Sequence, residues 1–76
     1  MLSHYHFIYK NYKTKEEQTS PTTLGEDIKS AEEENYRMHC MGADWLPCIA
    51  VETREDGSHL LWILSEKGWT IEHYIL

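Results

Sequence analysis

The sequence predicts an α+β fold, in which one helix packs on an antiparallel sheet of about four strands in the order β-α-β-β-β. Aromatic and β-branched residues alternate with polar ones at residues 4–12, 48–54 and 69–75, as in half-buried strands. Between the first two of these segments, apolar residues recur at helical spacing across residues 24–38. One helix among several strands is typical of a helical layer on a single sheet.

The first predicted strand covers residues 4–12. Because side chains alternate between the two faces of a strand, Tyr5, Phe7 and Tyr9 share one face. This strand could join the meander of the later strands on either edge, and the sequence does not decide which. The polar stretch that follows, residues 13–22, is expected to be a mobile, exposed loop.

The helix has two candidate starts. Thr23 and Glu26 have the spacing of a capping box, in which a hydroxyl and a carboxylate satisfy two backbone amides. Ser30 and Glu33 have the same spacing, and a start there would leave the preceding residues extended. We favour the earlier start because it gives the helix a longer apolar face, interrupted by one asparagine. That face consists of Leu24, Ile28, Ala31 and Met38.

Two hairpins are expected after the helix. Asp56-Gly57 is a strong signal for a two-residue hairpin turn, and residues 65–68 provide a second turn. The first turn would place six residues together on the side that faces the helix: Ile49, Val51, Thr53, Leu60, Trp62 and Leu64. In the last strand, alternation groups Trp69, Ile71, His73 and Ile75.

This arrangement leaves Leu61 and Ile63 on the sheet face away from the helix. Together with Ala50 and Tyr74 they could form an apolar patch in water, which often marks an interface. The alternative is that the loop at residues 13–22 or Trp45 covers them.

Length and composition define the class of protein. The chain of 76 residues is expected to form a single domain, residues 1–76, and has no apolar run long enough to span a membrane. It lacks the N-terminal pattern of a secretory signal, so we expect a cytoplasmic protein. The net charge of −6 disfavours direct binding of nucleic acid and favours a basic partner. With only two cysteines, Cys40 and Cys48, free thiols are the favoured state.

We expect neither a cofactor nor a bound metal. His4 and His6 lie on one side of a strand, and His39, Cys40 and Cys48 are the other potential ligands, but the paired spacings of zinc sites are missing. No residues combine a nucleophile, a base and an oxyanion hole, so enzymatic activity is not expected.

Carboxylates are the most suggestive feature of the predicted helix. Acids one or two helical turns apart have spacings comparable with those of backbone phosphates. Tyr36 and Trp45 are candidate aromatic anchors, since such residues dominate interface energetics. The candidate partner-binding acids, two of which extend the set at the predicted hairpin tip, are Glu26, Asp27, Glu33, Glu34, Glu55 and Asp56.

In size, acidity and β-α-β-β-β plan, the chain resembles the small phage-encoded inhibitors of bacterial defence systems, the anti-CRISPR proteins in particular. The matching features are the acidic segment from Glu26 to Glu34, the Asp56-Gly57 hairpin and the lack of a catalytic constellation. The resemblance implies a stoichiometric inhibitor that acts in the bacterial host cell as a nucleic-acid mimic. It would bind a basic groove of a CRISPR effector complex, a basic protein or nucleoprotein partner. The lysines of residues 10–15 depart from this pattern.

A second function class is a structural or self-assembling module. A strand edge, or the apolar sheet face around Leu61 and Ile63, would then pair with another copy to give a homodimer.

Overall fold

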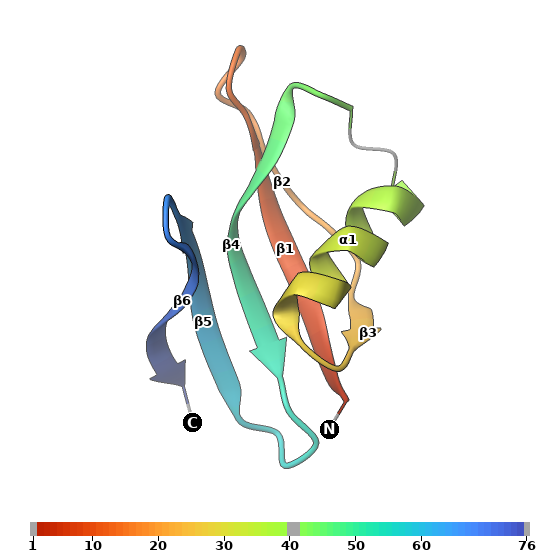
Figure 1. Ribbon diagram of the computed structural model, residues 1–76, viewed down its shortest axis with the longest axis vertical. Coiled ribbons are helices and arrows are strands. Elements are labelled where there is room, and N and C mark those ends of the chain that lie inside the picture. The colour runs from red at the N-terminus through yellow and green to blue at the C-terminus, as the bar shows by residue number, and fades with distance from the viewer. Residues whose placement is uncertain (1, 40–41, 76) are drawn as a thin grey trace.

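The computed structural model describes residues 2–39 and 42–75. Within these residues the chain forms six strands and one helix (Figure 1). Their bounds are β1 Ser3–Asn11, β2 Glu17–Thr19, β3 Thr23–Gly25, α1 Ile28–His39, β4 Trp45–Thr53, β5 His59–Ser65 and β6 Gly68–Ile75.

The strands form one antiparallel sheet in the order β2-β1-β4-β5-β6, and β3 pairs with the first residues of β1. Figure 1 shows α1 crossing in front of β1 and lying next to β3, while β5 and β6 lie to one side of it. The α+β class is therefore confirmed. The predicted count of about four strands and the order β-α-β-β-β are wrong, because β2 and β3 precede α1. β1 joins the β4–β5–β6 meander at its β4 edge, one of the two edges that the sequence left open, and β2 lies outside it.

The segment predicted as a loop at residues 13–22 contains strand β2, so this prediction is wrong for residues 17–19. Asn11 ends β1 by accepting hydrogen bonds on its side chain from the backbone amides of Lys13 and Thr14, at 2.9 and 3.0 Å. All three residues of β2 are exposed. An edge strand whose side chains remain in water needs no apolar residue, which is why composition did not reveal it.

The helix begins later than predicted. The carboxylate of Asp27 accepts the backbone N–H of Ser30 at 2.8 Å and so caps α1. Hydrogen bonds from the backbone and the side chain of Ser30 hold the pKa of Asp27 below its usual value. Thr23, the predicted cap, lies in β3 instead. The backbone at Gly25, the last residue of β3, lies close to α1, since a Cβ added at Gly25 would lie 2.9 Å from that of Ala31.

The inward face of α1 consists of Ile28, Ala31 and Asn35, all buried. Asn35, which the sequence presented as an interruption, is 0% exposed and lies at the centre of the contact. Leu24 and Met38, predicted on the same face, are 50% and 61% exposed. Leu24 is paired with His4 in the sheet and so lies on the side away from the helix.

The core lies between α1 and the sheet. Phe7 is fully buried and its ring lies 5.8 Å from that of Trp69. Tyr5 and Tyr9 flank it on the same face of β1, as predicted. Other buried apolar side chains of the core are Ile28, Ala31, Ala50 and Leu60.

The β4–β5 hairpin has a different register from the predicted one. Thr53 pairs with His59, and Gly57 adopts a φ of 87° within a loop longer than two residues. A slip of one residue moves every side chain of a strand to the other face. Ala50 and Glu52 therefore lie on the helix side, and the three residues predicted there lie on the opposite side: Ile49, Val51 and Thr53.

The β5–β6 pair contains an irregularity that the alternation pattern did not anticipate. Leu61 pairs with His73 and Trp62 with Ile71, so Glu72 is an extra residue in β6. Ile71 and His73 consequently lie on opposite faces, which corrects the prediction that they share one.

Candidate functional site

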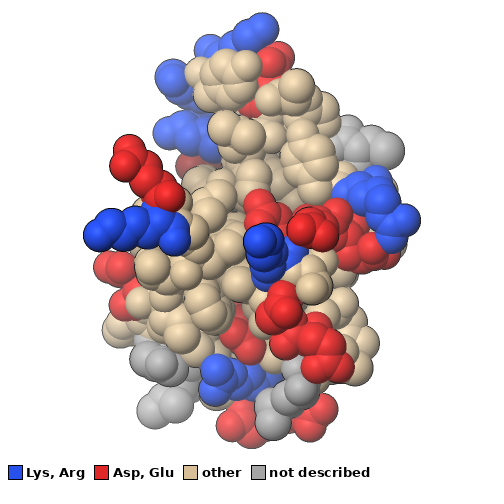
Figure 2. Space-filling view, viewed as in Figure 1, with Lys and Arg blue, Asp and Glu red and all other residues tan. Residues whose placement is uncertain are grey.

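Acidic side chains gather over α1 on the helix side of the molecule, with basic side chains among them (Figure 2). Glu33 is exposed, and Glu34 is paired with Arg37 one turn later. Asp27 is exposed but caps the helix. Glu26, also exposed, lies just before it. The acids predicted between Glu26 and Glu34 thus form one surface, and Asp27 and Glu34 also serve the fold.

A shallow hollow of about 340 Å³ borders this surface and is lined by Glu32, Glu33, Tyr36 and Arg37. One carboxylate oxygen of Glu32 accepts the indole N–H of Trp69 at 3.0 Å, which fixes the side chain against the sheet. Two carboxylates beside an aromatic ring are groups that attract a lysine or arginine side chain.

The two predicted aromatic anchors are partly committed to the fold. Tyr36 packs on Tyr9 with ring centroids 6.0 Å apart, and its hydroxyl donates to the backbone carbonyl of Gly42. Trp45 is half-buried and packs against the core. Only Tyr36 also lines the hollow.

Glu55 and Asp56 are exposed in the β4–β5 turn. Figure 1 places this turn at the same end of the molecule as the start of α1. The carboxylate of Asp56 accepts the hydroxyl and the backbone N–H of Ser58 at 2.6 and 2.9 Å, which holds its pKa below the usual value. Its first role is therefore local, in shaping the turn, whereas Glu55 projects into solvent.

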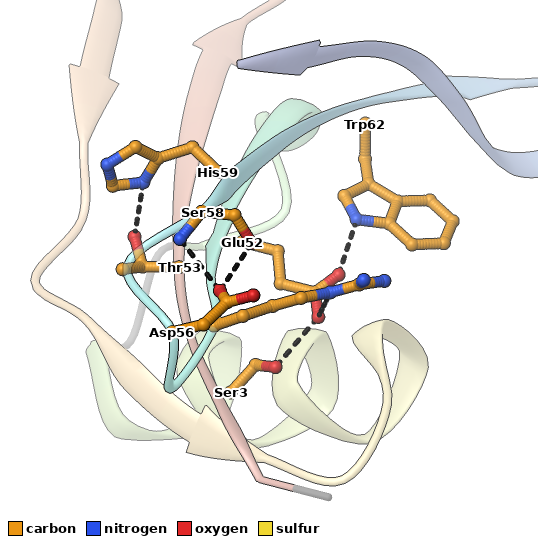
Figure 3. A network of polar contacts seen from close by, with 8 residues as sticks. Ser3, Glu52, Thr53, Asp56, Ser58, His59 and Trp62 are labelled. Carbon is orange, nitrogen blue, oxygen red and sulfur yellow. Dashed lines mark hydrogen bonds and ion pairs between the residues drawn. The ribbon is translucent and has the colours of Figure 1, made fainter. Parts of the chain in front are cut away.

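Glu52 is a buried acid that the predicted hairpin register missed (Figure 3). It is 5% exposed, and its carboxylate accepts the hydroxyl of Ser3 at 2.7 Å and the indole N–H of Trp62 at 3.0 Å. Arg54 lies 3.4 Å from the same carboxylate. Among the described residues, no buried side-chain nitrogen or oxygen lacks a partner. The cluster joins β1, β4 and β5 and has a structural role.

The sheet face opposite α1, here called the open face, bears a stripe of aliphatic side chains. Ile8 of β1, Ile49 of β4 and Ile63 of β5 follow one another across the strands, and Val51 and Leu61 form the next pair. The predicted patch is therefore correct for Leu61 and Ile63 but wrong for Ala50, which is buried on the helix side. The Tyr74 side chain lies outside the described part of the chain. Among the side chains that the structure describes, the aliphatic residues of the open face are Ile8, Leu24, Leu46, Ile49, Val51, Leu61 and Ile63.

The described residues that were considered for metal or thiol chemistry do not converge. Among the described residues, no three His, Cys, Asp or Glu side chains lie close enough to hold a metal ion. Cys48 is a free thiol that donates a hydrogen bond to the Ile8 carbonyl at 3.3 Å. Burial, and next the charge of Glu17, raise the pKa of the Cys48 thiol, so it is held in the less nucleophilic form. Cys40 lies outside the described residues.

These surfaces and this fold define a small α+β protein with one helix on an antiparallel sheet. No family model, curated protein or solved structure matches the chain. No helix within residues 2–39 and 42–75 is long and apolar enough to cross a membrane.

Proposed function

We propose that this protein is a non-enzymatic inhibitor that acts by stoichiometric binding. Its acidic surface on α1 would occupy the basic nucleic-acid-binding groove of a bacterial defence complex, such as a CRISPR effector, in the cytoplasm of the host cell. The observation on which the proposal rests is the hollow beside α1, where Glu32 and Glu33 lie beside the ring of Tyr36.

The dimensions of this surface support mimicry of a nucleic acid. Asp27 and Glu34 are two helical turns apart, which corresponds to ~10 Å along the axis. Backbone phosphates of one strand repeat every ~3.4 Å, so this span equals about three phosphate intervals. A groove that accepts phosphates would meet carboxylates at similar separations.

The composition of the hollow also favours a basic side chain as its occupant. An arginine or lysine of the partner would place its cation near the Glu33 carboxylate and against the Tyr36 ring. Arg37 lies at the same hollow and is paired with Glu34, so it partly neutralises the surface. Affinity would therefore depend on Glu33, the exposed carboxylate of the lining, more than on the total charge.

The proposal is tested by capture with the tagged protein from lysates that contain different CRISPR effector complexes, at low and high salt. We expect one such complex to be captured at low salt and released as salt rises, because exposed charge pairs are screened. Failure to capture an effector complex at low salt would contradict the proposal.

A charge reversal identifies the surface. Glu33→Lys should weaken capture by at least about tenfold, since like charges across an interface repel. Glu66→Lys, in the exposed turn between β5 and β6, makes the same charge change away from α1 and should leave capture unchanged. Equal capture by wild type and Glu33→Lys would show that the acidic surface is not the binding site.

A further inference from the structure

We infer that the open face of the sheet is the contact surface of a symmetric homodimer. This surface is opposite α1, so the inference is independent of the proposed inhibitory function. Ile8, Ile49, Val51, Leu61 and Ile63 are each half-buried by their neighbours alone. The described residues contain one helix, and it lies on the other side of the sheet (Figure 1).

The charge distribution identifies a second copy as the occupant. A two-fold interface places the same surface on both partners, so a charged surface would repel itself. This chain has a net charge of −6. Nevertheless, three successive rows of paired residues on the open face, which begin at Ile8, His6 and His4 of β1, contain no Asp, Glu, Lys or Arg on β1, β4 or β5. Glu17 and Lys10 pair with each other one row beyond the stripe. A basic partner would be attracted to the acids that gather over α1 (Figure 2).

Polar groups at the margin of the stripe fit the same contact. Four of the five histidines of the chain lie on the open face, at positions that pair with Thr53, Val51 or Leu61. An interface with an apolar centre and a polar margin is the common anatomy of a protein–protein contact. These histidines are His4, His6, His59 and His73.

The edges of the sheet are poorer contact surfaces than its face. β2 has three residues, and β6 contains an extra residue at Glu72 that interrupts its pairing pattern. Short and irregular edge strands resist the addition of another strand. Packing of two sheets face to face, about 10 Å apart, is the alternative that uses the aliphatic stripe.

The size of the open face sets the expected affinity. Strands lie ~4.8 Å apart and same-face side chains ~6.8 Å apart along each strand, so the footprint is on the order of 20 by 20 Å. The flat area of this face is therefore roughly 400 Å² per copy, which is at the small end of specific interfaces. The homodimer should therefore be weak, with a dissociation constant in the micromolar range or above.

Sedimentation velocity of the full chain from micromolar to millimolar concentration tests this inference. Wild type should shift from monomer to dimer, and the shift should persist at high salt because the contact is apolar. Leu61→Glu should remain monomeric at every concentration. Met38→Glu introduces the same charge at an apolar residue of α1 that is 61% exposed, and should dimerise like wild type.

Val51→Thr provides a second test in case Leu61→Glu does not fold, because it keeps the side-chain shape and the strand preference. It should weaken the dimer several-fold while the circular dichroism spectrum stays unchanged. A wild-type chain that is monomeric at the highest concentration would overturn the inference. A dimer that persists with both open-face substitutions, or that dissociates as salt rises, would also overturn the inference.

Discussion

The hydroxyl of Tyr9 on β1 donates a hydrogen bond of 2.7 Å to the side-chain carbonyl of Asn35 on α1. The amide nitrogen of Asn35 donates in turn to the Pro21 carbonyl at 3.0 Å and to the Thr23 hydroxyl at 2.8 Å. One fully buried asparagine thus fixes the helix to β1 and to the segment that leads into β3. This contact positions α1, and with it the acidic surface.

Asn35→Ala should lower the free energy of unfolding by about 2–3 kcal/mol, because it leaves the Tyr9 and Thr23 hydroxyls buried without this partner. Tyr9→Phe removes one hydrogen bond and should cost about 1 kcal/mol. Urea denaturation of both variants and of their double mutant measures the coupling between the two residues. Additive effects would show that the hydrogen bond contributes nothing to stability.

Gly25→Ala should destabilise the fold by about 1–3 kcal/mol, because the new methyl group would lie 2.9 Å from the Ala31 Cβ, closer than van der Waals contact, and would force α1 away from β3. Ala31→Gly removes the opposing methyl group. Although a helical glycine itself costs about 1 kcal/mol, the double variant should lose less stability than the sum of the single variants. Thermal unfolding of all three variants provides the comparison. A double variant that is as unstable as the sum would contradict the close approach seen here.

The stability of the protein should fall in alkali. Burial, and then the charge of Glu52, raise the pKa of Tyr5 to about 12. Burial, and then the charge of Glu32, likewise raise the pKa of Tyr9 to about 12. Both residues ionise near pH 10 in an unfolded chain, so the folded state holds these protons more tightly between pH 10 and 12.

The stabilisation is therefore complete below pH 10 and is lost as the pH rises through about 12. Urea midpoints measured across this range, with ultraviolet absorbance of tyrosinate as the second readout, should fall together with ionisation. Tyr9→Phe should show a shallower fall. A midpoint that stays constant to pH 12 would contradict the burial of these two hydroxyls.

Glu52→Ala should lower the free energy of unfolding by about 2 kcal/mol, since the Ser3 hydroxyl and the Trp62 indole N–H lose their acceptor. Glu55→Ala, an exposed acid three residues along the chain, is the matched control and should change stability by less than about 0.5 kcal/mol. Chemical denaturation followed by tryptophan fluorescence compares the two. Equal stability losses would refute a structural role for the buried carboxylate.

The alternation of apolar and polar residues correctly predicted the inward faces of β1 and β5. Tyr5, Phe7 and Tyr9 occupy the inward face of β1 because alternation alone specifies it. The inward face of β5 was predicted for the same reason, and Leu60 is 1% exposed. Alternation does not determine how two strands are aligned with each other, and the predicted pairing of β4 with β5 was wrong by one residue. That slip concealed both the burial of Glu52 and the full extent of the open face.

Local signals were also insufficient at the start of the helix. Thr23, Asp27 and Ser30 are all residues that cap helices well, and Asp27 is the one that caps α1. The Thr23 hydroxyl accepts a hydrogen bond from Asn35 instead. The acids of the candidate site could be identified from the sequence as a cluster, but the hollow that Tyr36 shares with Glu32 and Glu33 depends on how α1 lies on the sheet.

The proposed exclusion of nucleic acid from a defence complex by the acidic surface of α1 is tested most directly by competition. Target-DNA binding to purified CRISPR effector complexes is measured during titration with this protein. For at least one complex, we expect DNA binding to be abolished at about one equivalent of wild type and retained with Glu33→Lys. DNA binding that is unchanged at saturating wild-type protein for every complex, or that is lost equally with Glu33→Lys, would contradict it.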